Sequence, residues 1–219
     1  MKLLDLFCKA GGASVGYHRA GFDVVGVDIK KQKRYPFEFI QADALEILAD
    51  KKYLSQFDVI TASPPCQTHS ITQHLRNAQG RTTDKIDLIP ETRAALLEWG
   101  GTYIIENVPG APLINAVTLC GSSFGLKVRR HRQFESNVFL MGSQCDHKSQ
   151  GRPIGVYGGL RDDIPKGGKT ADSVEQAREA MGIDWMLWGE LVEAIPPAYT
   201  EFLGKQVVEA LNPQVLRSK

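Results

Sequence analysis

The stretch DLFCKAGGASVG, residues 5–16, decides the fold, because an apolar run leads directly into glycines and then into a helical pattern. This order of strand, glycine turn and helix is typical of a parallel α/β sheet, where the turn brings backbone amides and a helix N-terminus towards a ligand. The glycines at 11, 12 and 16 do not follow the GxGxxG pattern, which disfavours a dinucleotide and leaves a smaller adenosine-bearing ligand open. A tight turn that holds no ligand is the alternative.

Apolar runs and helical patterns alternate over the first 110 residues. The expected strands span residues 3–7, 23–29, 37–43, 57–63 and 102–108. The expected helices between them span residues 13–21, 44–50 and 89–100. Strict alternation predicts an α/β fold with a parallel sheet covered by helices on both faces.

The later part of the chain has a different character. Residues 143–170 are rich in glycine, polar and charged residues with little periodicity, which predicts a small irregular subdomain or an insertion. Helical patterns return at 173–182, with Ser173 as the expected cap, and at 196–211, where prolines open the helix. The last helix is expected to fold back beside the glycine turn.

Composition narrows the class of protein. The 219 residues suit one domain, and a net charge of +1 means that any contact with nucleic acid must come from local basic patches. No apolar run approaches the roughly 18–20 residues that span a bilayer, and the N-terminus lacks a secretory pattern. We therefore expect a cytoplasmic protein without a membrane segment.

The four cysteines, at 8, 66, 120 and 145, show no CxxC spacing, which argues against a disulfide framework and against a structural zinc site. Cys145 and His147 invite a zinc interpretation, but no second pair of ligands lies at the usual spacing. The expectation is that the protein holds no metal.

Several side chains with chemical potential follow the expected strands. Cys66 lies in TASPPCQTHS just after the fourth strand, where two prolines restrict the backbone. A lone cysteine is more often a small buried apolar residue than a nucleophile. Glu106 in ENVPG follows the fifth strand, and RRHR at 129–132 concentrates guanidinium groups. Because ligands bind at the carboxyl edge of parallel strands, these groups are expected to meet there with Asp28 and Asp43.

Together the ordered motifs resemble the DNA (cytosine-5) methyltransferases, and in particular small phage or bacterial members. The motifs are DLFC followed by AGG, the aspartates at 28 and 43, PPCQ, ENV, RRHR and PPAYTEFLGKQ. The resemblance covers nearly the whole chain except about 143–172. It implies a Rossmann-like sheet that binds S-adenosylmethionine, with a catalytic core at 1–142, a very small target-recognition region at 143–172, and C-terminal helices at 173–219 that complete the core.

The resemblance also implies roles for single residues. Cys66 would be the nucleophile that adds to C6 of a flipped cytosine, Glu106 would hold N3 and the exocyclic amine, and Arg132 would contact O2 with support from Arg130. The residues expected to bind S-adenosylmethionine are Phe7, Gly11, Gly12, Asp28, Asp43 and Pro65. A loop at 73–87 would close over the base, and the side chains expected to meet DNA phosphates are Arg76, Arg81 and Lys85.

Three positions depart from the family pattern. Lys9 stands where the family usually has a glycine, Asp28 where glutamate is commoner, and Val128 where a glutamine usually opens the arginine motif. The short region 143–172 also leaves little protein to contact the major groove, which predicts brief or relaxed target choice.

The leading hypothesis is a monomeric enzyme on double-stranded DNA. A catalytically silent binding relative is the first alternative, and the intact set of Cys66, Glu106 and Arg132 argues against it. An RNA or free-nucleotide methyltransferase is the second alternative, although the arginine-rich segments suit a polymer better than a mononucleotide. Trp185 and Trp188 are expected to pack in the core rather than to stack on bases.

Overall fold

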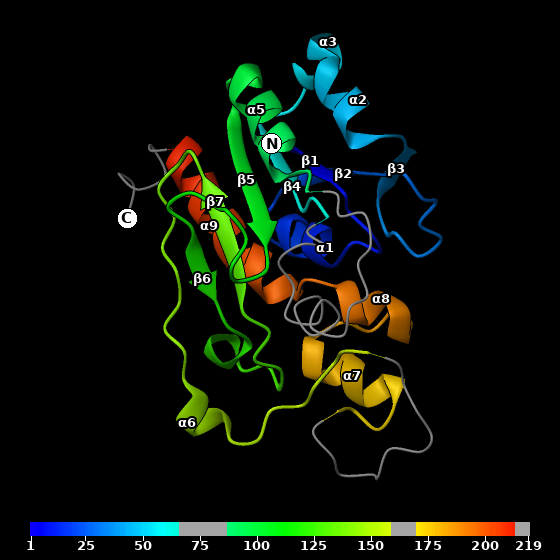
Figure 1. Ribbon diagram of the computed structural model, residues 1–219, viewed down its shortest axis with the longest axis vertical. Coiled ribbons are helices and arrows are strands. Elements are labelled where there is room, and N and C mark those ends of the chain that lie inside the picture. The colour runs from blue at the N-terminus through cyan, green and yellow to red at the C-terminus, as the bar shows by residue number, and fades with distance from the viewer. Residues whose placement is uncertain (66–86, 159–169, 213–219) are drawn as a thin grey trace, which may run out of the picture.

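The computed structural model describes residues 1–65, 87–158 and 170–212. Within these residues the chain forms a seven-stranded sheet in the order β3-β2-β1-β4-β5-β7-β6, with helices on both faces (Figure 1). The strands are β1 (Lys2–Leu6), β2 (Asp23–Asp28), β3 (Glu38–Gln41), β4 (Val59–Ala62), β5 (Thr102–Asn107), β6 (Val117–Leu119) and β7 (Arg132–Ser136). The predicted α/β fold is confirmed. Its division at 142 and 172 stays a prediction.

The sheet combines parallel and antiparallel strands. Strands β1 to β5 are parallel as predicted. At the other edge β7 pairs antiparallel with β5, and β6 pairs antiparallel with β7. The sequence RQFES of β7 shows no apolar alternation, because buried Glu135 is held by an ion pair with Arg93 and not by apolar contacts. The strands expected between residues 3 and 108 are therefore parallel as predicted, and the two antiparallel strands come later in the chain.

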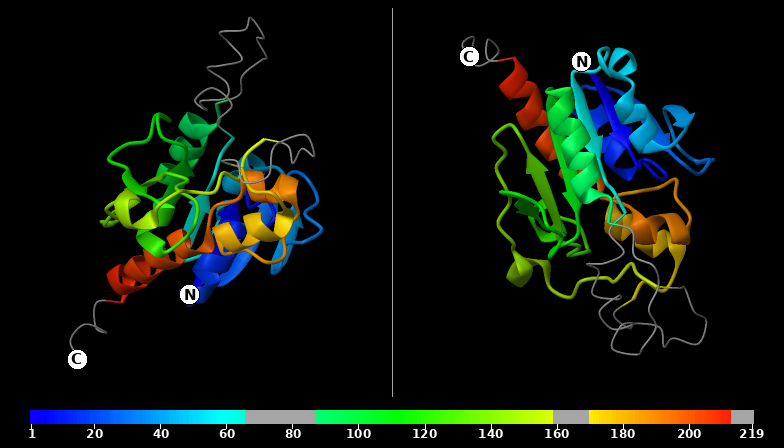
Figure 2. Two further views of the ribbon diagram at one scale, coloured as in Figure 1. Left: turned by 90° about the horizontal axis from the view of Figure 1, so that it is seen from below. Right: turned by 45° about the horizontal axis from the view of Figure 1, so that its top comes forward.

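Some helices lie on the two faces of the sheet, and others lie beyond one end of its strands. The helices are α1 (Gly12–Arg19), α2 (Ala44–Ala49), α3 (Lys51–Leu54), α5 (Ile89–Trp99), α6 (His147–Gln150), α7 (Val174–Met181), α8 (Trp188–Glu193), α9 (Pro197–Leu211) and a short 3-10 helix η1 (Gly121–Phe124). Leu3 packs with α1 and α9 on one face, whereas its neighbour Leu4 packs with α2 and α5 on the other (Figure 2). Successive strand residues point to opposite faces, so burial of both faces explains the unbroken apolar runs.

The C-terminal helix α9 lies against α1, as expected. A Cβ added to Gly16 would lie 2.0 Å from Thr200 Oγ1 and 2.1 Å from the carbonyl oxygen of Pro197. The Thr200 hydroxyl donates a hydrogen bond to the carbonyl of Ala13 over 2.8 Å. A residue without a side chain is needed at position 16 because the two helices touch through their backbones.

A third apolar cluster joins α7 and α8 to the sheet. It includes Ala10 and Val128 from the core, and Trp185 and Trp188 pack against it as predicted. The indole N–H of Trp185 donates to the carbonyl of Ala10 over 2.8 Å. None of the helices in the described ranges is both long and apolar enough to cross a membrane.

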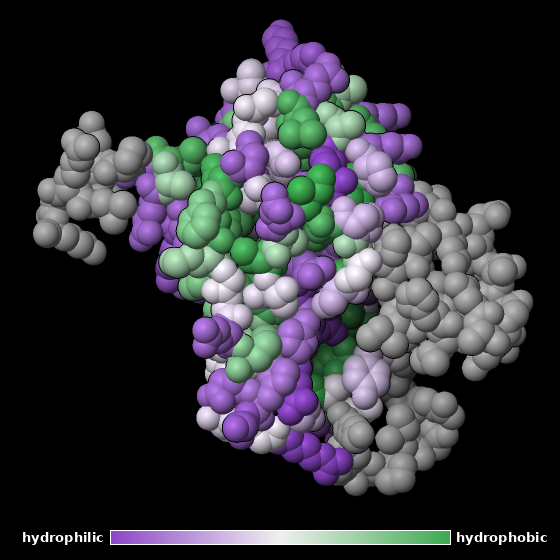
Figure 3. All heavy atoms as spheres, turned by 60° about the vertical axis from the view of Figure 1, so that its left-hand side comes forward, coloured by the Kyte–Doolittle hydropathy of each residue, from purple (hydrophilic) through white to green (hydrophobic). Residues whose placement is uncertain are grey.

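The region around α6 contrasts with this cluster. Helix α6 contributes no buried residue. In Figure 3 the lower end of the molecule, where α6 lies, is covered mainly by hydrophilic side chains. Helix α6 therefore adds no buried side chain to the apolar clusters among the described residues.

Candidate active site

The turn after β1 has an unusual backbone. Phe7 and Lys9 have φ angles of 60° and 49°, in the left-handed region, and Gly11 has a φ of 83°. Hydrogen bonds from Cys8 N to the carbonyl of Val27 and from Gly11 N to the carbonyl of Cys8, each 3.0 Å long, hold the turn against β2. Lys9, where the family usually has glycine, adopts a conformation that glycine adopts without strain.

Asp28 fastens the same turn from the end of β2. Its buried carboxylate accepts a hydrogen bond from Lys9 N at 3.1 Å and another from Lys30 N at 2.9 Å. Each carboxylate oxygen has a second lone pair, so both can still accept from a ligand hydroxyl. The structure thus brings Asp28 beside the glycine turn, as expected.

Packing restricts both glycines of the turn. A Cβ on Gly12 would lie 2.4 Å from the carbonyl oxygen of Ile195, and one on Gly11 would lie 2.9 Å from Pro36 Cδ. Gly12 is also the first residue of α1. These contacts explain why glycine stands at both positions, independently of any ligand.

Asp43 lies one strand further out and has a structural task. It follows β3 and caps α2, where its side chain accepts a hydrogen bond from Leu45 N over 2.8 Å. Its expected contact with an adenine stays a prediction. Pro65 is exposed after β4, and Cys66 lies outside the described residues, as do Arg76, Arg81 and Lys85.

Glu106 is a buried carboxyl near the end of β5. Its Oε1 lies 3.1 Å from Nε of Arg132, the first residue of the neighbouring strand β7. Burial raises the pKa of Glu106, although the positive charge of Arg132 and a hydrogen bond from Ser63 act in the opposite direction. The structure therefore brings together the glutamate and the arginine that the sequence predicted as partners around a base.

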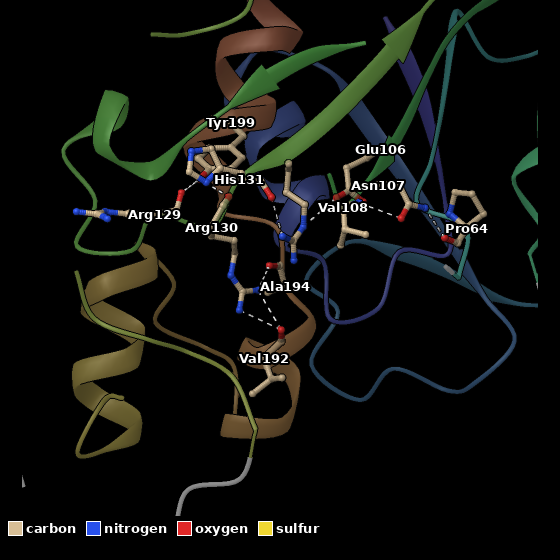
Figure 4. Close-up of polar contacts among 11 residues, drawn as sticks. Pro64, Glu106, Asn107, Val108, Arg129, Arg130, His131, Val192, Ala194 and Tyr199 are labelled. Carbon is tan, nitrogen blue, oxygen red and sulfur yellow. Dashed lines mark hydrogen bonds and ion pairs between the residues drawn. The ribbon is translucent and has the colours of Figure 1, made fainter. Parts of the chain in front are cut away.

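Asn107, beside Glu106, connects β5 to the segment that follows β4. Its side-chain amide donates to the carbonyl of Pro64 over 3.0 Å, and its Oδ1 accepts from Val108 N at 2.9 Å (Figure 4). Sequence analysis did not single out Asn107. The signal was its place within ENV, where a side chain with both a donor and an acceptor follows the glutamate.

Arg130 points away from Glu106 and holds other parts of the backbone. Its guanidinium donates to the carbonyls of Val192 at 3.0 Å and Ala194 at 2.6 Å (Figure 4). It also donates to the carbonyl of Val156 at 2.5 Å. Burial, with a smaller effect of the Arg132 charge, lowers its pKa to about 9. Arg130 is thus a positioning residue that ties the arginine segment to α8 and to residue 156.

Tyr199 supports the same segment from α9. Its hydroxyl lies 2.9 Å from the carbonyl oxygen of Arg130 and 3.2 Å from that of Arg129, and its single hydrogen is shared between them. Tyr199 was not singled out from the sequence, because the distant carbonyls that its hydroxyl contacts are set by the tertiary fold. The predicted site residues that the structure describes form two groups along one edge of the sheet. The turn after β1 holds Phe7, Gly11 and Gly12, with Asp28 beside it. Another part of the same edge holds Glu106 and Arg132.

A cavity of about 520 Å³ opens beside the arginine segment. Four arginines and several apolar side chains line it, including Arg129, Arg130, Arg132, Arg152, Ile154 and Tyr157. Its volume lies within the range of small-molecule sites. The lining combines positive charge with apolar surface, which suits a planar, hydrogen-bonding group next to a phosphate.

Solved structures share this fold. A DNA modification methyltransferase encoded within a prophage of E. coli superposes with a TM-score of 0.65 at 16% sequence identity, covering 97% of this chain and 99% of that one. The S. pombe Dnmt2 methyltransferase superposes with a TM-score of 0.63 at 13% identity, covering 97% and 99%. The chain therefore shares the fold of these two methyltransferases.

The sequence narrows this class to one family. Residues 1–114 match the family described as C-5 cytosine-specific DNA methylase. The chain belongs to this family. A curated relative, the type II methyltransferase M.AgeI of Thalassovita gelatinovora, is 26% identical over 174 residues, which are 65% of this chain and 39% of the relative. The chain thus aligns with well under two thirds of that protein's length.

Proposed function

We propose that the protein transfers a methyl group from S-adenosylmethionine to C5 of cytosine in double-stranded DNA, through a covalent adduct between Cys66 and C6. The observation that carries this proposal is the pairing of buried Glu106 with Arg132 at the end of β5, in a chain of this family. The relative M.AgeI supports the same class of activity, since it is called a type II methyltransferase.

The raised pKa of Glu106 supports its proposed role as an acid. A protonated carboxyl can donate to N3 of cytosine while its other oxygen accepts from the exocyclic amine. Arg132, which faces Glu106, would hold the base O2. Both contacts draw electron density from the ring and make C6 open to attack.

Cys66 then adds as a thiolate to C6, forming a carbon–sulfur bond while N3 takes the proton of Glu106. The electron pair displaced from the ring makes C5 nucleophilic. S-adenosylmethionine, when bound, would supply an electrophilic methyl group to C5 and would leave as neutral S-adenosylhomocysteine when its sulfur–methyl bond breaks. Loss of the C5 proton to a base expels Cys66 as a thiolate, N3 returns its proton to Glu106, and 5-methylcytosine is released.

The turn between β1 and α1 fits the cofactor. The left-handed backbone at Phe7 and Gly11 curves around the end of β1, and Asp28 offers two partly used acceptor oxygens for ribose hydroxyls. Asp43 and Pro65 would complete the site at its adenine and methyl ends. Gly12 would let the first turn of α1 approach closely.

The target base must leave the helix to reach these groups. The arginine-lined cavity beside Arg132 supports this part of the proposal, because its volume of about 520 Å³ exceeds that of a single base and its charge suits the adjoining phosphates.

A mechanism-based trap tests the proposal. Oligonucleotide duplexes containing 5-fluorocytosine should form a stable covalent complex with the protein and S-adenosylmethionine, because fluorine cannot leave as the C5 proton does. Cys66→Ser should form none, and His18→Asn, altered on the outer side of α1, should react like the parent. Trapping by Cys66→Ser at the parental level would contradict the assigned nucleophile.

Labelled methyl donor offered with separate pools of DNA, RNA and nucleotides tests the substrate. We expect label in DNA alone. Label only in RNA or in nucleotides would overturn the proposed substrate, and no label in any pool together with intact DNA binding would favour a silent binding relative.

A further inference from the structure

We propose that Cys120, His131, Cys145 and His147 form a tetrahedral zinc site. One ligand atom from each side chain lies within 4.8 Å of every other. Sequence analysis dismissed zinc because Cys145 and His147 had no second pair at the usual spacing. These two residues have no second pair at the usual sequence spacing, but the fold brings Cys120 and His131 to them from positions 14 to 27 residues earlier.

Two of the distances between the ligand atoms are close to those expected around a tetrahedral zinc ion. Sγ of Cys120 lies 3.3 Å from Nε2 of His147, and Nε2 of His131 lies 3.2 Å from Sγ of Cys145. Bonds of about 2.3 Å to sulfur and about 2.0 Å to nitrogen place tetrahedral ligands roughly 3.3–3.8 Å apart. The two imidazole planes cross at 77° with centroids 5.3 Å apart, so the rings converge on the thiols without stacking on each other.

A neighbouring hydroxyl supports one thiolate. Oγ of Ser122 lies 3.1 Å from Sγ of Cys120 and accepts a hydrogen bond from Asp146 N over 3.0 Å. Because the hydroxyl oxygen already accepts from that amide, its own hydrogen is free to point at the sulfur. Such a donor stabilises a metal-bound thiolate, as outer hydrogen bonds do at known zinc sites.

The donor set identifies the ion. Two thiolates and two imidazoles in tetrahedral array are typical of zinc. Four protein ligands leave no open coordination position, so the ion would be structural. Cys145 is exposed, which gives the ion a route into the site.

A zinc ion at this site would explain how helix α6 is held against the rest of the fold. Helix α6 has four residues and none is buried, and short helices are marginal without tertiary support. The ligands come from the end of β6, the approach to β7 and the start of α6, so one ion would join all three. It would also fix His131, the residue directly before Arg132.

Metal analysis of the full chain tests the proposal. Protein freed of any affinity tag, and purified with zinc and without chelators, should contain one zinc per chain by mass spectrometry of the metal. Cys120→Ser and His147→Asn should each weaken zinc binding by about 100-fold or more, since each removes a direct ligand. The matched controls His18→Asn and Cys66→Ser should keep one zinc, and Cys66→Ser does so even though it removes the proposed nucleophile.

Cobalt substitution keeps the test decisive if a variant fails to fold. Parent protein reconstituted with Co²⁺ should show the visible bands of tetrahedral cobalt and a thiolate-to-cobalt charge-transfer band, and a chelator should lower its melting temperature. Zinc-free parent after dialysis against zinc would overturn the proposal. So would a Cys120–Cys145 disulfide in the native protein, or zinc content unchanged in both ligand variants.

Discussion

At the scale of single residues, burial and a nearby positive charge have opposite effects on the pKa of Glu106. Burial raises its pKa, while Arg132 at 3.1 Å opposes this without reversing it. A carboxyl with a raised pKa keeps its proton to higher pH than a free glutamate, so it can act as an acid near neutrality.

We therefore expect Glu106→Gln to lower turnover by roughly 10²–10⁴-fold, the range typical of a lost acid or base, with a smaller loss of DNA binding. Parental activity that depends on the protonated form should fall as pH rises through the raised pKa, and the variant should lack this fall. Steady-state methylation rates between pH 5 and 9 measure both. Glu98→Gln, on the outer side of α5, is the control, and a variant with parental turnover would contradict the role of Glu106.

Lys9 offers a second test at this scale. Its φ of 49° costs a residue with a Cβ about 1 kcal/mol, which glycine avoids. Lys9→Gly and Lys9→Ala both remove the exposed contact of Lys9 with Glu193, so their difference isolates the backbone. In urea unfolding we expect Lys9→Gly to be more stable than Lys9→Ala by about 1 kcal/mol, and equal stability would show that the turn relaxes to suit a side chain.

At the scale of elements, a buried ion pair joins α5 to β7. Nε and Nη2 of Arg93 donate to the two carboxylate oxygens of Glu135 over 2.8 Å and 2.7 Å. Tyr103 and the backbone of Ile114 also donate to Glu135, which is only 2% exposed. This network fastens the antiparallel edge, which carries Arg132, to the parallel part of the sheet.

Arg93→Ala should lower the free energy of unfolding by about 3–5 kcal/mol, because it leaves the buried carboxylate of Glu135 without its cation. Chemical denaturation followed by circular dichroism measures the loss. Lys205→Ala removes an exposed pair on α9 and should change stability by less than about 0.5 kcal/mol. Similar losses in both variants would mean that the buried pair contributes no more than a surface pair.

Elements differed in how well the sequence predicted them. Strands β1, β2, β4 and β5 were predictable because both of their faces are buried, so each is a short apolar run bounded by turn residues. Strands β6 and β7 were missed because their burial depends on partners elsewhere in the chain, such as Arg93 for Glu135. The same limit applies to Tyr199 and to the Cys120–His131 half of the cysteine and histidine cluster, which only the tertiary fold brings to their partners.

At the scale of the whole molecule, the contact of α1 with α9 closes the fold. Gly16→Ala would place a methyl group against Thr200 and against the backbone oxygen of Pro197, which cannot move without shifting α9. We expect this variant to lose about 1–3 kcal/mol of stability, the usual cost of overpacking.

The matched control is Gly189→Ala in α8, where an added Cβ would meet nothing within 4 Å. It should leave stability unchanged or raise it by up to about 1 kcal/mol. Thermal unfolding of both variants provides the comparison. A Gly16→Ala protein as stable as the parent would show that the two helices do not press on each other as described.

The hydrogen bond between Thr200 and Ala13 spans 187 positions of the chain, and this has a consequence for biosynthesis. At about 5–20 residues per second, a ribosome needs roughly 10–40 s to add the segment that separates them. During that interval helix α1, which follows the glycine turn, is not yet covered by α9. A nascent polypeptide halted before Pro197 would thus carry all seven strands of the sheet but none of the helix that closes it, which would make it a substrate for chaperones and proteases.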